Sequence, residues 1–115
     1  MHYAEVANKD FYLIVKGKKH KLRLFTIETS IDCYNEFSTP ENKNGLEVMQ
    51  EKLGASDPMT ICKLCYILLA DKSPFENDFE KFFEHVKNLP NAMVLYAQII
   101  PVFEHSNPDN TKKKM

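Results

Sequence analysis

Hydrophobic and polar residues alternate near the N-terminus, in residues 11–25 (FYLIVKGKKHKLRLF). A period of two is typical of strands with one buried face. A two-residue turn at Gly17-Lys18 would place Leu13 opposite Leu22, with glycine permitting the positive φ of a tight turn. Because a lone hairpin is marginal in water, we expect helices to cover its apolar face. That face would carry Phe11, Leu13, Val15, His20, Leu22 and Leu24.

The apolar spacing then becomes helical. Thr26 is a predicted N-cap, and Asn44 with Glu47 resembles a capping box. The next helix is predicted to begin at Asp57-Pro58 and to be the most buried one. The first helix is predicted to carry an apolar stripe of Ile27, Ile31, Tyr34 and Phe37. The second helix is predicted to carry Leu46, Met49 and Leu53 and to end at Gly54.

Two further helices are predicted in the C-terminal part of the chain. Asn77 with Glu80 predicts a capped, strongly amphipathic helix, and Pro101 should kink or divide the last helix. The apolar residues of the two helices are Phe79, Phe82, Phe83, Val86 and Leu89, and then Met93, Val94, Ala97, Ile100 and Phe103.

The order of elements therefore predicts a mainly α (α+β) fold, with an N-terminal antiparallel β-hairpin packed on about five short helices. A chain of 115 residues suits one domain with one core. We expect a flexible N-terminus over residues 1–10, a single globular domain over 11–105 and a disordered polar tail over 106–115.

Composition narrows the environment of the protein. The formal net charge is −1, so the whole molecule is not drawn strongly to nucleic acid or to anionic membranes. No apolar run approaches the roughly 20 residues that cross a bilayer, and the N-terminal sequence lacks the pattern of a secretory signal. Three cysteines, an odd number, fit a reducing cytoplasm better than a disulfide framework.

Candidate chemistry is sparse. Cys62 and Cys65 form a C-x-x-C, but a tetrahedral metal site needs a second pair or two suitably spaced histidines. The pair falls within an apolar helix, where two small core residues are the expected interpretation. No nucleophile elbow, phosphate-binding loop or metalloprotease motif occurs. The sequence thus predicts no catalytic, cofactor-binding or metal-binding residues and a protein that is not an enzyme, although distant segments can assemble a site without a motif.

Five basic residues crowd the hairpin, from Lys16 to Arg23. They could bind nucleic acid by releasing counterions. Single-strand binding also needs exposed aromatic rings for base stacking, and Tyr12 alone clearly offers one. The favoured interpretation is therefore that the lysines lie on a solvated hairpin face and prevent edge-to-edge strand pairing. A small regulatory or host-interaction protein that binds nucleic acid through this hairpin is the alternative function.

The last two helices carry more apolar surface than one neighbour can cover. Phe82 and Phe83 are adjacent, and a helix that faces one neighbour cannot bury both equally. Surplus apolar area of this kind suits a partner, either an oligomer or a peptide groove. Burial in the core is the alternative for the same residues. The predicted partner-binding residues are Phe79, Phe82, Phe83, Val86, Tyr96, Ile99, Ile100 and Phe103.

The whole arrangement resembles the tail assembly chaperones of long-tailed bacteriophages and prophages, in their short form. The resemblance covers residues 11–106, through the hairpin, a helix ending in Leu-Gly, a helix introduced by Asp-Pro (DPMTICKLCYILLAD) and a helix that begins DFEKFF. It implies a non-enzymatic protein in the cytoplasm of the bacterial host, absent from the mature virion. Its partners would be the tape measure protein and the tail tube protein, and a homo-oligomer stays open.

Overall fold

The computed structural model describes residues 10–106. The predicted fold class is confirmed: a two-stranded antiparallel hairpin packs on five α-helices. The predicted flexible N-terminus and polar tail lie outside the described residues, apart from Asp10 and Ser106. The elements are β1 (Tyr12–Val15), β2 (Lys18–Lys21), α2 (Ile27–Phe37), α3 (Gly45–Gly54), α4 (Pro58–Leu68), the 3₁₀ helix η1 (Ser73–Phe75), α5 (Phe79–Val86) and α6 (Met93–Ser106).

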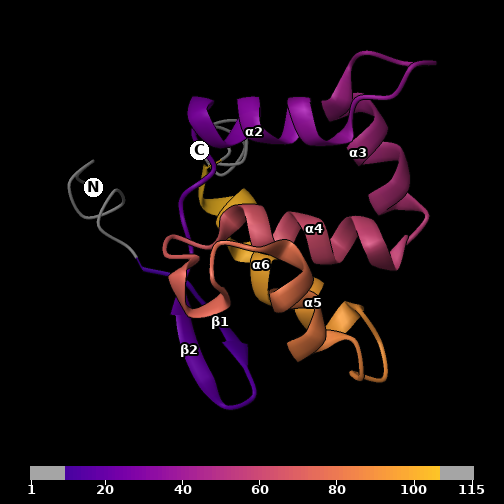
Figure 1. The fold of residues 1–115 in the computed structure, drawn as a ribbon. Helices are drawn as coiled ribbons and strands as arrows, with labels where there is room; N and C mark the ends of the chain where they lie inside the picture. The colour runs from indigo at the N-terminus through magenta and orange to yellow at the C-terminus, as the bar shows by residue number, and fades with distance from the viewer. Residues whose placement is uncertain (1–9, 107–115) are drawn as a thin grey trace, which may run out of the picture.

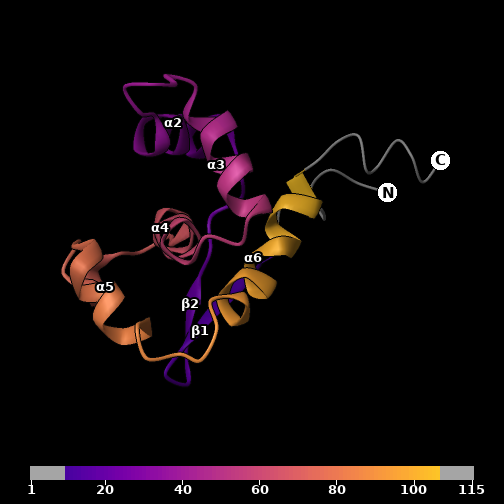
Figure 2. The ribbon, with the colours of Figure 1, turned by 90° about the vertical axis from the view of Figure 1, so that its right-hand side faces the viewer.

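Helix α4 is the centre of the fold, as predicted from its wide apolar arc. It contacts α2, α3, α5 and α6, while α6 also packs against β1 (Figures 1 and 2). In the view of Figure 2, α5 and α6 lie on opposite sides of α4, with α2 and α3 above it. The hairpin turn and helix α2 lie at opposite ends of the molecule in both views.

The hairpin has the predicted faces but a different register. Leu13 pairs with His20, not with Leu22, because the turn residues are Lys16 and Gly17. Both have positive φ, 50° and 81°, as a type I′ turn requires, and this turn matches the natural twist of the strands. The predicted turn at Gly17-Lys18 is therefore wrong. Because the shift is two residues, each side chain keeps its face, and Leu13 and Val15 are buried.

Helix α2 turns a different face to the core from the predicted stripe. Its buried residues are Thr29, Cys33 and Phe37. The Thr29 hydroxyl donates to the carbonyl of Leu24 at 3.0 Å, which satisfies this polar group inside the protein. Of the predicted stripe, Phe37 alone is buried. The other three members, Ile27, Ile31 and Tyr34, are exposed to 82%, 53% and 42%.

Helix α6 is likewise rotated relative to the prediction, by about one residue. Leu95, Ile99 and Val102 are its buried residues, spaced i, i+4 and i+7. The predicted stripe residues Met93 and Val94 are exposed instead. The helix also continues through Pro101 to Ser106, so the proline does not divide it.

Helix starts were predicted well. The Thr26, Asn44 and Asp57 caps are confirmed, each side chain accepting a hydrogen bond from a backbone N–H of its first turn. The Asn77 cap is wrong, because Asp78 accepts from the N–H of Glu80 and so begins α5 one residue later.

The end of α4 joins the helices to the hairpin. The helix ends at Leu68, and Leu69 then forms an isolated antiparallel bridge with Leu22 of the hairpin. The N–H of Arg23 donates to the carbonyl of Leu68 at 2.7 Å, and Ala70 donates to Lys21 at 2.9 Å. These bonds satisfy backbone groups at the hairpin edge and hold its apolar face over α4.

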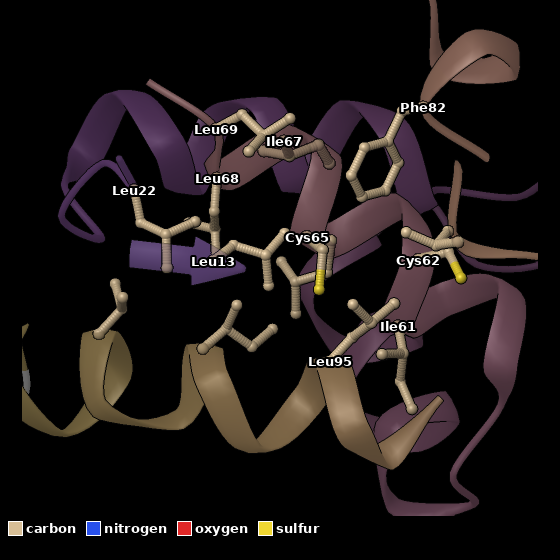
Figure 3. Packing of buried hydrophobic residues seen from close by; sticks show 14 of the residues in the cluster. Leu13, Leu22, Ile61, Cys62, Cys65, Ile67, Leu68, Leu69, Phe82 and Leu95 are labelled. Atoms are coloured by element: carbon tan, nitrogen blue, oxygen red, sulfur yellow. The ribbon is translucent and has the colours of Figure 1, made fainter. Parts of the chain in front are cut away.

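One continuous cluster of buried side chains joins β1 to all the helices (Figure 3). It includes Leu13 and Leu22 of the hairpin, Cys65 and Leu68 of α4, and Leu95 of α6. Phe82 enters the cluster from α5 and is fully buried. This core fixes the angles of α3 and α6, which frame the groove described next.

Candidate protein-binding surfaces

A groove with mostly apolar walls lies between α3 and α6, with a volume of about 270 Å³. Phe25 and Phe103 both line it, with their ring centroids 4.8 Å apart. Gln50 and Glu104 are the polar groups at its margin. The groove is lined by Phe25, Leu46, Met49, Gln50, Leu53, Tyr96, Ile100, Phe103 and Glu104.

The core determines which side chains of α6 reach this groove. Burial of Leu95, Ile99 and Val102 leaves the neighbouring stripe, one residue further along, at the edge of the core. That stripe is Tyr96, Ile100 and Phe103, all partly buried and spaced i, i+4 and i+7. Such spacing presents three side chains in a row over two helical turns.

Helix α3 supplies the opposite wall through Leu46, Met49 and Leu53. Asn44 fixes the start of the helix by accepting a hydrogen bond from the N–H of Glu47 at 3.2 Å. Gly45 lets α3 approach α2 closely, because a β-carbon at this position would collide with the backbone carbonyl of Tyr34. The width of the groove therefore depends on the contact between α2 and α3.

The eight predicted partner-binding residues divide into three groups. Tyr96, Ile100 and Phe103 line the groove. Phe82, Val86 and Ile99 belong to the core, with exposed fractions of 3% or less, so no partner can reach them in this conformation. The helix phase, which the sequence left open, buries them. The remaining two, Phe79 and Phe83, are partly buried and stack on each other with ring centroids 5.9 Å apart.

A larger cavity of about 670 Å³ lies between α2, α4 and α5. Its apolar lining is Met59, Tyr66, Ile67 and Phe79. Charged side chains surround it in pairs: Arg23 contacts Asp32 at 3.1 Å, and Lys63 contacts Glu36 at 3.4 Å. Exposed pairs of this kind contribute little stability.

Lys72 is the most constrained cation of this cavity. Its ammonium donates to the carbonyls of Leu69 and Ile67, at 2.9 Å and 3.3 Å, and lies over the ring of Tyr66 at 5.5 Å. Burial lowers the pKa of Lys72, and the nearby charge of Arg23 lowers it further. Because the ammonium caps carbonyls near the C-terminus of α4, a structural role accounts for it.

The cysteines offer no reactive centre. Cys62 and Cys65 are buried and unpaired, which confirms their interpretation as core residues. Burial raises the pKa of both thiols and raises that of Cys33 to about 12, so thiolates are scarce at neutral pH. Among residues 10–106, no three His, Cys, Asp or Glu side chains gather as metal ligands would.

All four lysines of the basic hairpin are exposed. Lys19 lies over the ring of Tyr12, 5.4 Å from its centroid, and Lys21 contacts Asp10 at 3.4 Å. The Tyr12 ring, which a base would need for stacking, is therefore already in contact with a lysine of the same hairpin.

Sequence reasoning missed the outward stripe of α2, Ile27, Ile31 and Tyr34, as a surface feature. Their helical spacing predicts them, together with Phe37, as the apolar stripe of this helix. The available signal was a second line at helical spacing, Thr29, Cys33 and Phe37, which is the buried one.

No protein-family model, curated protein or solved structure matches the chain. Within the described residues, no helix combines the length and the apolar character that crossing a membrane would require.

Proposed function

We propose that this protein is a non-enzymatic binding protein that holds an apolar helical segment of a partner in the α3–α6 groove. The supporting observation is that Tyr96, Ile100 and Phe103, predicted as partner-binding residues, line an apolar groove whose other wall comes from a distant part of the sequence. Apolar grooves between helices commonly take the apolar face of an amphipathic helix.

The resemblance to tail assembly chaperones supplies the identity of the client in this proposal. A tape measure protein carries long apolar helices, which must be kept soluble until tail tube subunits assemble around it. The groove would cover one stripe of such a helix at a time. The chaperone would act in the cytoplasm of the bacterial host and leave before the virion matures.

Dimensions support a helical client. The groove stripe of α6 runs from Tyr96 to Phe103, seven residue steps along the helix or about 10 Å. A client helix presents its own i, i+4 and i+7 side chains over the same length. Gln50 and Glu104 at the margin would remain in contact with water.

Co-expression with a tape measure protein tests the proposal. We expect the wild-type chain to raise the soluble fraction of the client, and Ile100→Lys to remove this effect by placing a charge in the groove. Val94→Lys is the matched control, because Val94 lies on the same helix, is 47% exposed and does not line the groove. A client that stays equally insoluble with and without the wild-type chain would refute the proposed chaperone function.

The four exposed hairpin lysines favour one second candidate, a regulatory or host-interaction protein that binds nucleic acid. Retention on a DNA or RNA column that weakens steeply with salt would support it. No retention at low salt would remove it. Lys18→Glu/Lys19→Glu should abolish retention without affecting client solubility, which separates the two functions.

A further inference from the structure

Asn44 is followed by Gly45, and no other asparagine of the chain precedes a glycine. In such a pair the backbone nitrogen of the glycine can attack the side-chain amide of the asparagine, because glycine has no β-carbon to hinder the approach. Asn44 is exposed to water, whereas Gly45 is buried against α2. The pair therefore combines a reactive sequence with a position that holds one end of α3 in place.

The first turn of α3 supplies groups that favour this attack. The N–H of Gly45 is one of the first of the helix, which have no acceptor within it, so no helical hydrogen bond holds its proton. The side-chain carbonyl of Asn44 accepts a hydrogen bond from the N–H of Glu47 at 3.2 Å, which polarises the carbon under attack. The positive end of the helix dipole also stabilises the negative charge that develops on the carbonyl oxygen. The same bond that caps the helix thus activates the amide.

The folded cap nevertheless keeps the two reacting atoms apart. Attack closes a succinimide ring, in which the Gly45 nitrogen and the side chain of Asn44 lie on the same side of the bond between Cα and the carbonyl carbon. The ψ angle of Asn44 is 89°, which places the nitrogen almost opposite the β-carbon. Asn42 fixes this conformation, since its side chain accepts from the N–H of Asn44 at 2.9 Å and donates to the carboxylate of Glu47 at 2.6 Å. The ring can therefore close only when the first turn of α3 opens, as helix ends do more readily than the core.

We propose that Asn44–Gly45 is a spontaneous modification site, which the α3 cap protects and which opening of the first turn of α3 exposes to deamidation by water. The Gly45 nitrogen bonds to the side-chain carbon of Asn44, and its proton passes through solvent to the departing amide, which leaves as ammonia. Water then hydrolyses the ring. Cleavage of the new bond gives aspartate, and cleavage of the original peptide bond gives isoaspartate. The reaction consumes water and releases ammonia in equal amounts, with no change of oxidation state.

The two products affect α3 differently. Aspartate keeps a capping oxygen and adds negative charge at the N-terminus of the helix, which is compatible with the fold. Isoaspartate inserts a methylene group into the backbone directly before Gly45, where even a β-carbon would collide with the carbonyl of Tyr34. The first turn of α3 then no longer fits against α2, and Leu46, which lines the α3–α6 groove, is displaced. Loss of client binding in this form rests on the proposed function, whereas the modification does not.

Ageing of the full chain in mildly alkaline buffer, followed by tryptic digestion and mass spectrometry, tests the site. Deamidation raises the mass of a peptide by about 1 Da. We expect it several-fold faster at Asn44 than at Asn91, which accepts a hydrogen bond from the N–H of Met93 at 2.9 Å at the start of α6 but precedes Ala92. Unfolding the chain in urea should raise the rate at Asn44 several-fold further, because it frees the ψ angle. A freshly digested sample corrects for deamidation during digestion.

Three variants test the role of the cap. Asn42→Ala removes both hydrogen bonds that fix the conformation of Asn44 and should speed its modification several-fold in the folded chain. Asn88→Ala changes an exposed asparagine away from α3 and, as the matched control, should leave the rate unchanged. Asn44→Ser retains a capping hydroxyl without an amide, so it should show no mass change at this position. Chromatography isolates the isoaspartate form, whose urea midpoint should lie below that of the unmodified chain.

Equal rates at Asn44 and Asn91 would overturn the assignment of the site. A rate that unfolding does not raise, or that Asn42→Ala leaves unchanged, would refute protection by the cap. An isoaspartate form with an unchanged urea midpoint would refute the misfit against α2. The co-expression assay is separate: a wild-type chain that does not solubilise a tape measure protein refutes the proposed function, while the modification rates stand independently.

Discussion

The two adjacent phenylalanines of α5 allow a sharp test of the core. Phe82 is fully buried, and its ring lies 5.1 Å from Phe75 and 5.7 Å from Tyr66. Phe83, the next residue, is only partly buried and stacks on Phe79. If helix phase decides which side chains hold the fold, Phe82→Ala and Phe83→Ala should differ greatly in stability despite their identical chemistry.

The magnitude follows from burial. Removing a fully buried Phe side chain costs about 4 kcal/mol through lost transfer energy and the cavity that remains. Native domains are stable by about 5–15 kcal/mol, so Phe82→Ala should remove a large share of the total. The melting temperature should fall by about 15 °C for a chain of this length. Phe83→Ala removes partly solvated surface and should cost about 1 kcal/mol.

Urea unfolding followed by far-UV circular dichroism measures both variants. The midpoint concentration should fall strongly for Phe82→Ala and slightly for Phe83→Ala, with similar slopes if unfolding stays two-state. Equal losses would refute this reasoning, since they would mean that α5 presents both rings to the core. A larger loss for Phe83→Ala would place the buried face of α5 one residue further along.

Three other outcomes are expected. Gly45→Ala should destabilise the protein by about 3 kcal/mol or more, because the new β-carbon would collide with the backbone of α2. Gly54→Ala, which has open space around the new β-carbon, should be neutral or stabilising. Thermal unfolding measures both variants. Hydrogen bonds from the Thr60 hydroxyl and backbone N–H lower the pKa of Asp57. The stability from this N-cap is therefore present above pH 4 and is lost as pH falls through the lowered pKa. In urea unfolding, Asp57→Ala should cost about 1 kcal/mol at pH 7 and less at pH 2.5. Burial raises the pKa of Cys33 to about 12 in the folded protein, so the thiol of the unfolded chain loses its proton at a lower pH. Stability should therefore fall as pH rises from about 9. The urea midpoint should decline less steeply with pH in Cys33→Ala than in the wild type.

The hairpin shows what a sequence pattern can establish. A period of two identified the buried face, and that face survived an error in the turn because a shift of two residues preserves side-chain direction. The turn itself was less accessible to prediction. Lys16 adopts φ of 50°, an uncommon conformation for a residue other than glycine, and the type I′ turn imposes it.

Helix phase in α2 was harder to predict than helix position. Two stripes compete there, and the more apolar one, which includes Ile27 and Ile31, faces solvent. Thr29 can be buried because its hydroxyl donates to the Leu24 carbonyl, a hydrogen bond that a hydrophobicity scale does not include. Average hydrophobicity therefore indicated the wrong face.

The candidate site was half predictable for a similar reason. Surplus apolar residues on α6 predict Tyr96, Ile99, Ile100 and Phe103 as a binding stripe, and all but the buried Ile99 line the groove. The opposite wall, with Leu46 and Met49, lies some fifty residues earlier in the chain. Its position depends on how α3 packs against α2 at Gly45, which follows from the assembled fold and not from local pattern.

Helices α2 and α6 share one property that links the fold to binding: each carries two stripes at helical spacing. In α6 the groove stripe follows the buried stripe by one residue, a rotation of about 100°, so Tyr96 and Ile100 stay partly covered. In α2 the two stripes are two residues apart, a rotation of about 200°, so Ile27 and Ile31 point away from the core. The inward stripes supply the folding energy in both helices. Substitutions in the outward stripe of α2 should therefore have little effect on stability, whereas those in the groove stripe of α6 should reduce both stability and client binding.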